Sequence, residues 1–354
     1  MHVNEIKIEN FRNIDFMGIF PHKEINVIYG QNGQGKTNLL EAIWLFTGAK
    51  SFRGAKDSEF IRFGQNEAYV KTEFFKDGAL LDSEMKIGER RKAYLNGNAL
   101  SSPGALAGNF CAIVFSPQDI SLIKDGPAVR RRFLDTAIFQ IYPKYVEIMR
   151  KYTRAVQQRN AAVKDLYYHS ELASLIDVFD AEIVENGKKI IEYRKNYIDL
   201  LKQIVPKIYS GISENKENLD ISYNLNCSSE FLAERLKAAR REDMRTGVTS
   251  VGPHRDDIEF SINDTSARLY GSQGQKRSVA LSLKLAEAEI LKEKTGSRAV
   301  ALLDDVMSEL DPSRQVYVLN HIKDWQVFIT CCDPQNTKNL ASGRVFKIEN
   351  GEIK

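Results

Sequence analysis

A glycine-rich segment carries the clearest chemical pattern in this sequence. Residues 30–37 read Gly-Gln-Asn-Gly-Gln-Gly-Lys-Thr, which fits the pattern G-x-x-x-x-G-K-[ST] of a phosphate-binding loop. An apolar run at 24–29 precedes the loop and a helical pattern at 38–46 follows it, so the expected strand–loop–helix setting is present. The glycines allow a tight turn, and the loop amides and the helix N-terminus would then bind phosphate.

Two side chains of this loop have separate expected roles. Lys36 would reach the β- and γ-phosphates of ATP as a point charge. Thr37 would supply a hydroxyl oxygen to Mg²⁺, a hard cation that prefers oxygen ligands. We expect the whole loop to contact the nucleotide, namely Gly30, Gln31, Asn32, Gly33, Gln34, Gly35, Lys36 and Thr37.

Two carboxylates follow a predicted buried strand at 299–303. Asp304 suits Mg²⁺, directly or through water, and Asp305 is placed to orient or deprotonate an attacking water. Gln118 follows another apolar run, at 110–115. Alone it would more often be a surface residue, but beside the other motifs we expect its amide to bind Mg²⁺ and the attacking water. The predicted catalytic residues are Asp305, Lys36 and Gln118, and the predicted metal ligands are Thr37, Gln118 and Asp304.

A second anion-binding pattern, which we call the signature motif, lies at residues 272–275. Its sequence is Ser272-Gln273-Gly274-Gln275, at the start of a predicted helix over 276–293. A serine and a glycine there offer a hydroxyl, amides and the helix dipole to an anion, although an ordinary N-cap is the stronger explanation for four residues in isolation. Because this motif would duplicate the task of the phosphate loop, we expect a head-to-tail dimer in which each signature motif caps the partner's γ-phosphate.

Helical periodicity dominates from residue 126 to about residue 245. Apolar residues recur every seven positions in two series, which are Tyr142, Met149, Val156 and Val163, and then Ile176, Ile183, Ile190, Tyr197 and Ile204. Such spacing marks a seam between helices, so an antiparallel helical hairpin is predicted. Gly187 would weaken its second helix, and Pro206 would kink or end it. We expect the hairpin to be a packed helical subdomain. Its possible function is that of a lever or of an arm that faces DNA.

The net charge of the chain is compatible with binding to nucleic acid but does not by itself indicate it. The net charge is +3 and the isoelectric point is about 8.5, so DNA binding would need basic residues gathered on one face. The candidates for DNA contacts are Arg130, Arg131, Arg132, Arg240 and Arg241, although a solvated face of mixed charge explains the last two equally well. Residues 252–257 form an unusual polar turn whose role chemistry alone does not give.

Composition narrows the class of protein further. No run of about 18 apolar residues exists, so no membrane span is expected, and the N-terminus lacks the pattern of a secretory signal. The four cysteines show no C-x-x-C spacing, and free thiols in a reducing cytoplasm are expected.

We predict an ATPase domain split into residues 1–125 and 246–354, with the helical arm domain inserted at 126–245.

Taken together, these motifs resemble the ABC-type ATPases, within them the branch that includes SMC proteins, and most of all the RecF family of bacterial recombination proteins. The stretches that carry the resemblance are Phe11-Arg12-Asn13, 30–37, 117–135, 252–257, 271–275 and 302–311. The resemblance implies an α/β fold: an ABC-type ATPase head, with a parallel-sheet core around the P-loop and an antiparallel β lobe, and an inserted α-helical arm. It also implies that Arg12 contributes to nucleotide binding.

The resemblance implies a function as well. It would be a cytoplasmic, ATP-dependent DNA-binding homodimer that helps to load recombinase at single-stranded gaps, with RecR and RecO as partners. Support of DNA replication and of the SOS response, and weak DNA-stimulated ATP hydrolysis, would follow. The alternatives are another SMC-like ATPase or a transporter-type ABC ATPase, and ATP-dependent DNA binding without a membrane partner would separate them.

The sequence departs from the expected pattern at three places. Gln118 replaces the glutamate that family members often carry, and Phe52 stands where they usually have histidine. Thr330-Cys331-Cys332 ends a predicted strand without the switch histidine of transporters, so the sequence leaves open which residue there senses the γ-phosphate.

Overall fold

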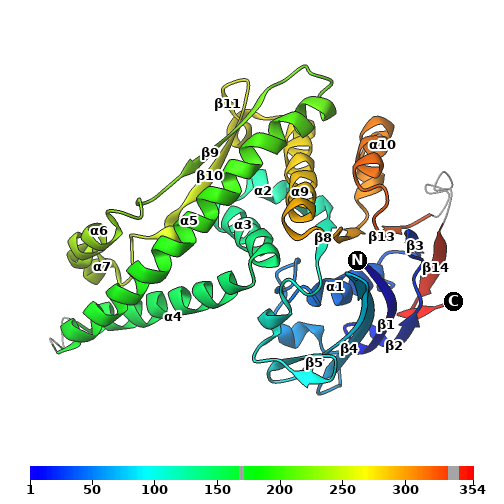
Figure 1. Cartoon of the computed structure of the whole chain (residues 1–354), viewed down its shortest axis with the longest axis horizontal. Coiled ribbons are helices and arrows are strands. Elements are labelled where there is room, and N and C mark those ends of the chain that lie inside the picture. The colour runs from blue at the N-terminus through cyan, green and yellow to red at the C-terminus, as the bar shows by residue number, and fades with distance from the viewer. Residues whose placement is uncertain (167–168, 170, 334–342) are drawn as a thin grey trace. The chain divides into compact units, whose positions relative to one another are not determined.

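The computed structural model describes residues 1–166, 169, 171–333 and 343–354. The chain forms two compact units, each described here by itself (Figure 1). The head unit comprises Met1–Asp119 and Leu281–Lys354, and the arm unit comprises Ile120–Ala280. Within the described parts of the chain, no helix is both long and apolar enough to cross a membrane.

The parallel sheet of the head unit sets the geometry of the candidate site. Its strand order is β15-β14-β3-β13-β12-β8, with every pairing parallel except that of β15 with β14. The strands are β3 (Ile25–Tyr29), β8 (Ala112–Phe115), β12 (Val300–Leu303), β13 (Val327–Cys331), β14 (Arg344–Glu349) and β15 (Glu352–Ile353). β8, β12 and β13 are buried throughout, as is typical of central parallel strands. The carboxyl ends of β3, β13, β12 and β8 therefore meet, in this order, at one edge.

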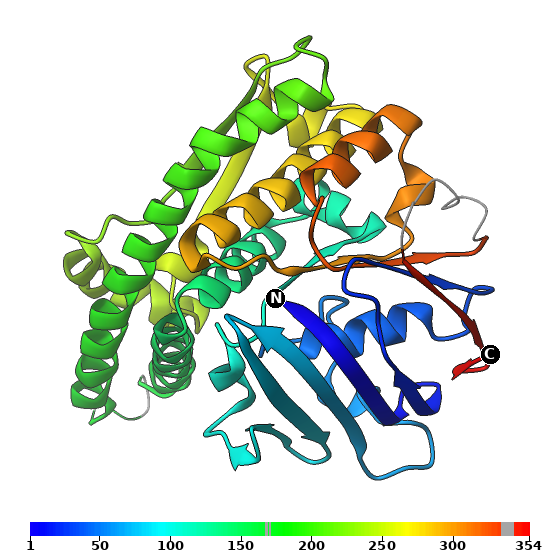
Figure 2. The ribbon, with the colours of Figure 1, turned by 45° about the vertical axis from the view of Figure 1, so that its right-hand side comes forward.

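A second, antiparallel sheet completes the head unit and confirms the predicted β lobe (Figure 2). Its order is β2-β1-β4-β5-β6-β7, formed by β1 (His2–Phe11), β2 (Ile14–Ile19), β4 (Ala68–Lys76), β5 (Ala79–Ile87), β6 (Arg91–Leu95) and β7 (Asn98–Ala99). The helices of this unit are α1 (Lys36–Leu45), α10 (Pro312–His321) and the larger part of α9 (Gln273–Thr295), with 3₁₀ turns at Asp57–Phe60, Pro103–Leu106, Pro117–Ile120 and Val306–Glu309.

The arm unit contains the predicted helical hairpin. α4 (Lys144–Asp165) packs along α5 (Leu172–Ile212), and the two helices can be followed in Figure 1. The other helices are α2 (Ser121–Lys124), α3 (Pro127–Ile141), α6 (Leu232–Ala238), α7 (Arg240–Thr246) and α8 (Ala267–Tyr270), with a 3₁₀ turn at Pro253–Arg255. In α5 the predicted seam is buried at Ile176, Ile183, Ile190 and Tyr197. In α4 Tyr145 and Tyr152 are more deeply buried than the predicted Met149, and the predicted Tyr142 lies just before this helix.

One expectation about α5 needs correction. The helix continues beyond Pro206 to Ile212, because Val205, Ile208 and Tyr209 around the proline are buried and hold the turn in place. At Gly187, whose expected weakening of the helix stays a prediction, the neighbouring side chains pack closely against the backbone. A Cβ atom there would lie 2.9 Å from Leu232 Cδ2 and 3.2 Å from a ring carbon of Tyr152, so a larger residue would require these side chains to shift.

The expected boundary at residue 245 is also wrong, since residues 246–280 belong to the arm unit. The reason is strand pairing: β10 (Asp257–Ile262) pairs antiparallel with β9 (Leu219–Asn224) and β11 (Thr265–Ser266), which gives a three-stranded sheet. Helical periodicity shows only where helices lie. A domain boundary based on it alone therefore leaves out strands, such as β10, that pair with strands of the arm.

Candidate nucleotide-binding site

The phosphate loop follows β3 and leads into α1, as predicted. Gly33 and Gly35 have φ values of 79° and 111°, a region that L side chains rarely adopt. Gly35 is the N-cap of α1, and no side chain caps that terminus. Because the first amides of a helix have no intrahelical acceptor, the N-terminus of α1 is suited to an anion, and the loop fits the phosphates of ATP.

Lys36 is buried against the loop. Its Nζ donates to the carbonyl oxygens of Gly30 at 2.7 Å and Gln31 at 3.2 Å. The same Nζ lies 3.8 Å from Sγ of Cys332, and this thiol contacts Oδ1 of Asn32 at 3.2 Å. Cys332, just after β13, therefore lies beside the phosphate loop.

Two further contacts hold the loop from outside. Nδ2 of Asn13 donates to the Gly33 carbonyl at 3.0 Å, and the amide of Gly351 donates to the Gln34 carbonyl at 3.0 Å. Asn13 also accepts a hydrogen bond from Asn38 of α1 at 2.7 Å. The segment after β1 and the turn between β14 and β15 thus both fix the loop.

Thr37 and Asp304, two of the predicted metal ligands, lie in direct contact. The Thr37 hydroxyl donates to Oδ1 of Asp304 at 2.8 Å. Neighbouring ligands of an octahedral Mg²⁺ with bonds of about 2.1 Å lie about 3 Å apart, so this oxygen pair fits one edge of such a site. Burial raises the pKa of Asp304 above its ordinary value, and the hydroxyls of Thr37 and Thr330 oppose that shift. A bound Mg²⁺ would favour the ionised carboxylate and neutralise charge on phosphate oxygens.

Asp305 occupies a strained turn that Thr330 holds. Its φ is 51°, in the left-handed region that is costly for residues other than glycine. Its amide donates to Oγ1 of Thr330 at 2.8 Å, and the same hydroxyl donates to Oδ1 of Asp304 at 3.0 Å. One buried hydroxyl therefore connects the Asp304 carboxylate to the backbone of Asp305. The sequence analysis named Thr330 only within the segment that could sense the γ-phosphate and did not predict this anchoring role.

Gln118 leaves the sheet at the expected edge. Phe115 of β8 pairs with Leu303 of β12, so the segments after both strands emerge side by side. The Gln118 side chain is exposed, and the backbone N–H of this residue donates to Oγ of Ser116 at 3.2 Å. Next to it, burial raises the pKa of Asp119 to about 6, and the charge of Lys284 opposes the shift.

Arg12 lies beside α1 and pairs with a carboxylate of that helix. Its guanidinium is 2.7 Å from Oε2 of the buried Glu41, and its side chain is only 17% exposed. Arg53 approaches the same oxygen at 3.7 Å and donates to Oδ1 of Asn38 at 3.1 Å. Its positive charge also favours the ionised form of Asp304 and so opposes the raised pKa. Arg53 is a second site residue that sequence reasoning did not select.

The signature motif lies in the arm unit and forms a reciprocal capping box at the start of α9. The Gln275 amide donates to Oγ of Ser272 at 3.2 Å, and the Ser272 amide donates to Oε1 of Gln275 at 2.7 Å. Oε1 of Gln273 accepts a hydrogen bond from Lys124 at 3.0 Å. The helix begins at Gln273, so Gly274 lies inside its first turn rather than before it.

The arginine candidates for DNA contacts differ in their availability. Arg130 is buried and pairs with Asp257 through two hydrogen bonds of 2.7 and 2.9 Å, so its expected DNA contact is corrected to a structural ion pair. Arg131 donates to the carbonyl of Asp256 at 2.7 Å, and Arg240 binds Asp177 and Asp180 at 2.5 and 2.7 Å. Arg132 and Arg241 are exposed.

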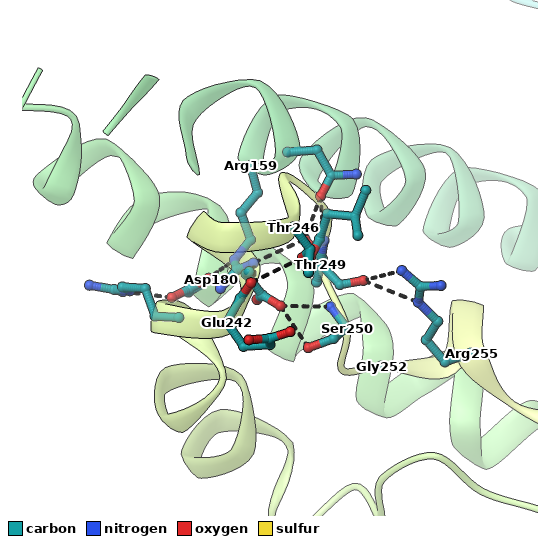
Figure 3. A network of polar contacts seen from close by, with 12 residues as sticks. Arg159, Asp180, Glu242, Thr246, Thr249, Ser250, Gly252 and Arg255 are labelled. Carbon is teal, nitrogen blue, oxygen red and sulfur yellow. Dashed lines mark hydrogen bonds and ion pairs between the residues drawn. The ribbon is translucent and has the colours of Figure 1, made fainter. Parts of the chain in front are cut away.

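The polar turn at 252–257 is a structural centre of the arm unit. Arg194 of α5 binds Asp135 of α3 through two hydrogen bonds of 3.0 and 2.9 Å and the Pro253 carbonyl at 2.6 Å. Arg255 donates to the carbonyl of Thr249 at 2.9 Å (Figure 3). The turn therefore joins α3, α5 and the segment before it, which gives it the structural role that the sequence did not reveal.

A buried arginine interrupts the apolar seam of α4. Arg159 donates to Asp180 at 2.5 Å, to Asp243 at 2.6 Å and to Thr249 at 3.0 Å (Figure 3). It thus joins α4 to α5 and to α7. Removing one partner of such a buried pair costs about 3–5 kcal/mol, because the other charge is left unpaired.

Comparison with known proteins places this geometry in a family. A family model described as "RecF/RecN/SMC N terminal domain" matches residues 2–354. The DNA replication and repair protein RecF of Agathobacter rectalis is 38% identical over 357 residues, covering 100% of this chain and 99% of that protein. A solved structure of the recombination mediator protein RecF with ATP, in the RecFOR pathway, aligns with a TM-score of 0.93 at 38% identity, covering 100% and 97% of the two chains. An Smc head domain of Pyrococcus furiosus aligns with a TM-score of 0.55 at 17% identity over 100% and 95% of the chains, which shows a shared fold alone.

Proposed function

This chain belongs to the RecF family of DNA replication and repair proteins, and from that membership we propose that it is an ATP-dependent DNA-binding protein of recombinational repair. One observation carries the proposal: Thr37, Asp304 and Asp305 converge beside Lys36 where β3, β13 and β12 end. Similarity to RecF proteins along the whole chain favours this function over the transporter-type alternative.

In the proposed reaction, Lys36 and the loop amides bind the phosphates of ATP. Thr37, Asp304 and Gln118 would hold Mg²⁺, while Asp305 orients or deprotonates the attacking water. Arg12, which pairs with Glu41 of α1, would contribute to nucleotide binding as well. Hydrolysis would be weak and stimulated by DNA, so that bound ATP acts mainly as a switch.

The switch would be an ATP-dependent homodimer. Each chain carries one phosphate loop and one signature motif, and each signature motif would dock on the γ-phosphate bound by the partner. DNA, at junctions of single-stranded and duplex regions, would bind to the dimer. RecR and RecO would be the further partners, a proposal supported by the RecFOR pathway of the solved relative. Loading of recombinase at gaps in the cytoplasm and support of SOS induction complete the proposed function.

Mixing two inactive variants tests the shared site. Lys36→Ala removes the interaction with phosphate, and Ser272→Arg places bulk and positive charge in the signature motif. Each variant alone should fail in ATP-driven dimerisation and hydrolysis, while Ser272→Arg still binds ATP as a single chain. In a mixed dimer one site carries both changes and the other is intact, so partial recovery of hydrolysis is expected. If Ser272→Arg dimerises with ATP as the wild type does, the shared-site proposal is wrong.

A further inference from the structure

We propose that Glu217 is a positioning residue that ties the signature motif to the end of the long arm helix α5. The proposal rests on the proposed function, because it concerns the docking of the signature motif on ATP held by a second copy. All of the residues involved lie in the arm unit: Tyr209 in the last turn of α5, Glu217 before β9, and Gln275 in the first turn of α9.

The side-chain amide of Gln275 has two partners, and their chemistry differs. Its oxygen accepts a hydrogen bond from the Ser272 amide at 2.7 Å, and its nitrogen donates to Oε1 of Glu217 at 2.7 Å. An ionised carboxylate only accepts hydrogen bonds, so Glu217 must face the NH₂ end of the Gln275 amide. That orientation leaves the Gln275 oxygen for Ser272, and the capping box at the start of α9 depends on it.

Tyr209 connects this carboxylate to α5. The tyrosine ring is fully buried, and its hydroxyl donates to Oε2 of Glu217 at 2.5 Å. One carboxylate oxygen of Glu217 thus binds the arm helix, and the other binds the signature motif. A shift at the end of α5 would therefore change the orientation of Gln275, and with it the turn that presents Ser272.

This connection gives DNA binding to the arm a route to the ATP switch. Since the hydroxyl and the first amides of the signature motif are the groups proposed to meet the γ-phosphate, their arrangement decides how well the dimer closes. Glu217 acts through Gln275 and contacts no nucleotide, which is why we describe it as a positioning residue.

Glu217→Ala is the direct test. ATP affinity of the single chain should stay within about twofold of wild type, because the phosphate loop lies in the head unit. ATP-driven dimerisation should weaken about tenfold or more, the effect of losing a charge-assisted hydrogen bond of about 1.5–3 kcal/mol. Glu214→Ala is the matched control, since Glu214 is an exposed glutamate of the same turn that pairs with Lys216, and it should behave as wild type.

Two further variants separate positioning from general destabilisation. Glu217→Gln can still accept from Gln275 but no longer enforces the amide orientation, so dimerisation should recover partly. Tyr209→Phe in the Glu217→Ala background should add no further loss, because both changes break the same connection.

The outcomes distinguish this inference from the proposed function. If Ser272→Arg abolishes ATP-driven dimerisation while Glu217→Ala dimerises as the wild type does, the role of Glu217 is wrong and the shared site stands. Equal losses in Glu217→Ala and Glu214→Ala would also overturn it. If Ser272→Arg itself has no effect, the shared site fails, and the inference fails with it.

Discussion

Thr330 shows how a single hydroxyl can organise the proposed reaction. It accepts from the Asp305 amide and donates to the Asp304 carboxylate, so the proposed metal ligand and the proposed base share one anchor. The strained backbone of Asp305 persists only if its surroundings hold it, and this hydrogen bond is one such restraint. The positions of Asp304 and Asp305 near the γ-phosphate would thus depend on Thr330 of the neighbouring strand β13.

Thr330→Val should lower the rate of ATP hydrolysis while changing ATP affinity little. Valine keeps the volume but leaves the Asp305 amide without its acceptor, and a loss of about tenfold to a hundredfold in kcat is expected. Thr330→Ser should restore most of the rate. Steady-state hydrolysis at saturating ATP measures this, with Thr72→Val, a buried threonine of β4, as control. A valine variant with wild-type kcat would show that Thr330 only fills space.

The thiol of Cys332 offers a test of the loop geometry. Cys332 is exposed and lies 3.8 Å from Lys36 Nζ, whereas Cys111, Cys227 and Cys331 are buried. Alkylation with N-ethylmaleimide should modify Cys332 first and abolish ATP binding, and ATP should slow the modification. Cys332→Ser should bind ATP and resist the reagent. Full ATP binding by protein alkylated at Cys332, as judged by mass spectrometry, would contradict this placement.

At the residue scale the sequence predicted the groups that belong to contiguous motifs. Lys36, Thr37, Asp304 and Asp305 could be selected as candidates because their motifs contain both the chemistry and the local structure. Thr330 could not be found in this way, because its role depends on β13 lying between β3 and β12. That order is a property of the sheet, and nothing in the sequence near Thr330 specifies it.

The arm helices show what periodicity can and cannot predict. Seven-residue spacing predicted the hairpin of α4 and α5 correctly, because burial of one face sets that spacing. The expectation that Pro206 would end the second helix came from proline chemistry instead, and the helix continues to Ile212 because the neighbours of the proline are buried. The spacing could not show that β10 pairs with β9. Long-range pairing follows from the packing of the whole arm unit rather than from local pattern.

His254 should make the arm unit sensitive to acid. Its ring contacts the Tyr152 hydroxyl at 2.6 Å and the Thr249 carbonyl at 2.9 Å, and burial lowers its pKa to about 4, helped by the charge of Arg255. The unfolded chain therefore binds a proton at higher pH than the folded chain does. The stabilising contribution is complete above the ordinary pKa of about 6.5 and is lost as pH falls toward 4.

Between pH 7 and pH 5 this histidine alone should lower the free energy of unfolding by about 2 kcal/mol. Urea unfolding at the two pH values measures the loss, and His254→Gln should show correspondingly less of it. His169→Gln, at an exposed histidine, is the control and should keep the wild-type pH dependence. If His254→Gln loses as much stability as the wild type, the histidine is not held neutral in the folded chain.

At the scale of the whole molecule, the proposed DNA binding has to be reconciled with the small net charge of the chain. Dimerisation would bring basic residues together, and Arg132 and Arg241 are the exposed ones among the original candidates. Changing both to alanine should weaken DNA binding without base preference and leave ATP binding intact. Removing one arginine–phosphate interaction should make the slope of log affinity against log salt shallower by about 0.9 on duplex DNA.

Arg90→Ala provides the control for that experiment, because Arg90 is an exposed arginine between β5 and β6 of the head unit. It should leave affinity and salt slope unchanged. Unchanged binding by the Arg132 and Arg241 double variant would mean that these arginines face solvent, and that other basic residues contact the DNA.

The most direct test of the account is the mass of the wild-type chain in solution, measured by sedimentation velocity with and without ATP and Mg²⁺, and then with DNA. We predict a monomer without nucleotide, a dimer with ATP, and DNA bound only to the dimer. A mass that does not change with ATP, together with equal DNA binding in both conditions, would contradict the proposed ATP-switched dimer.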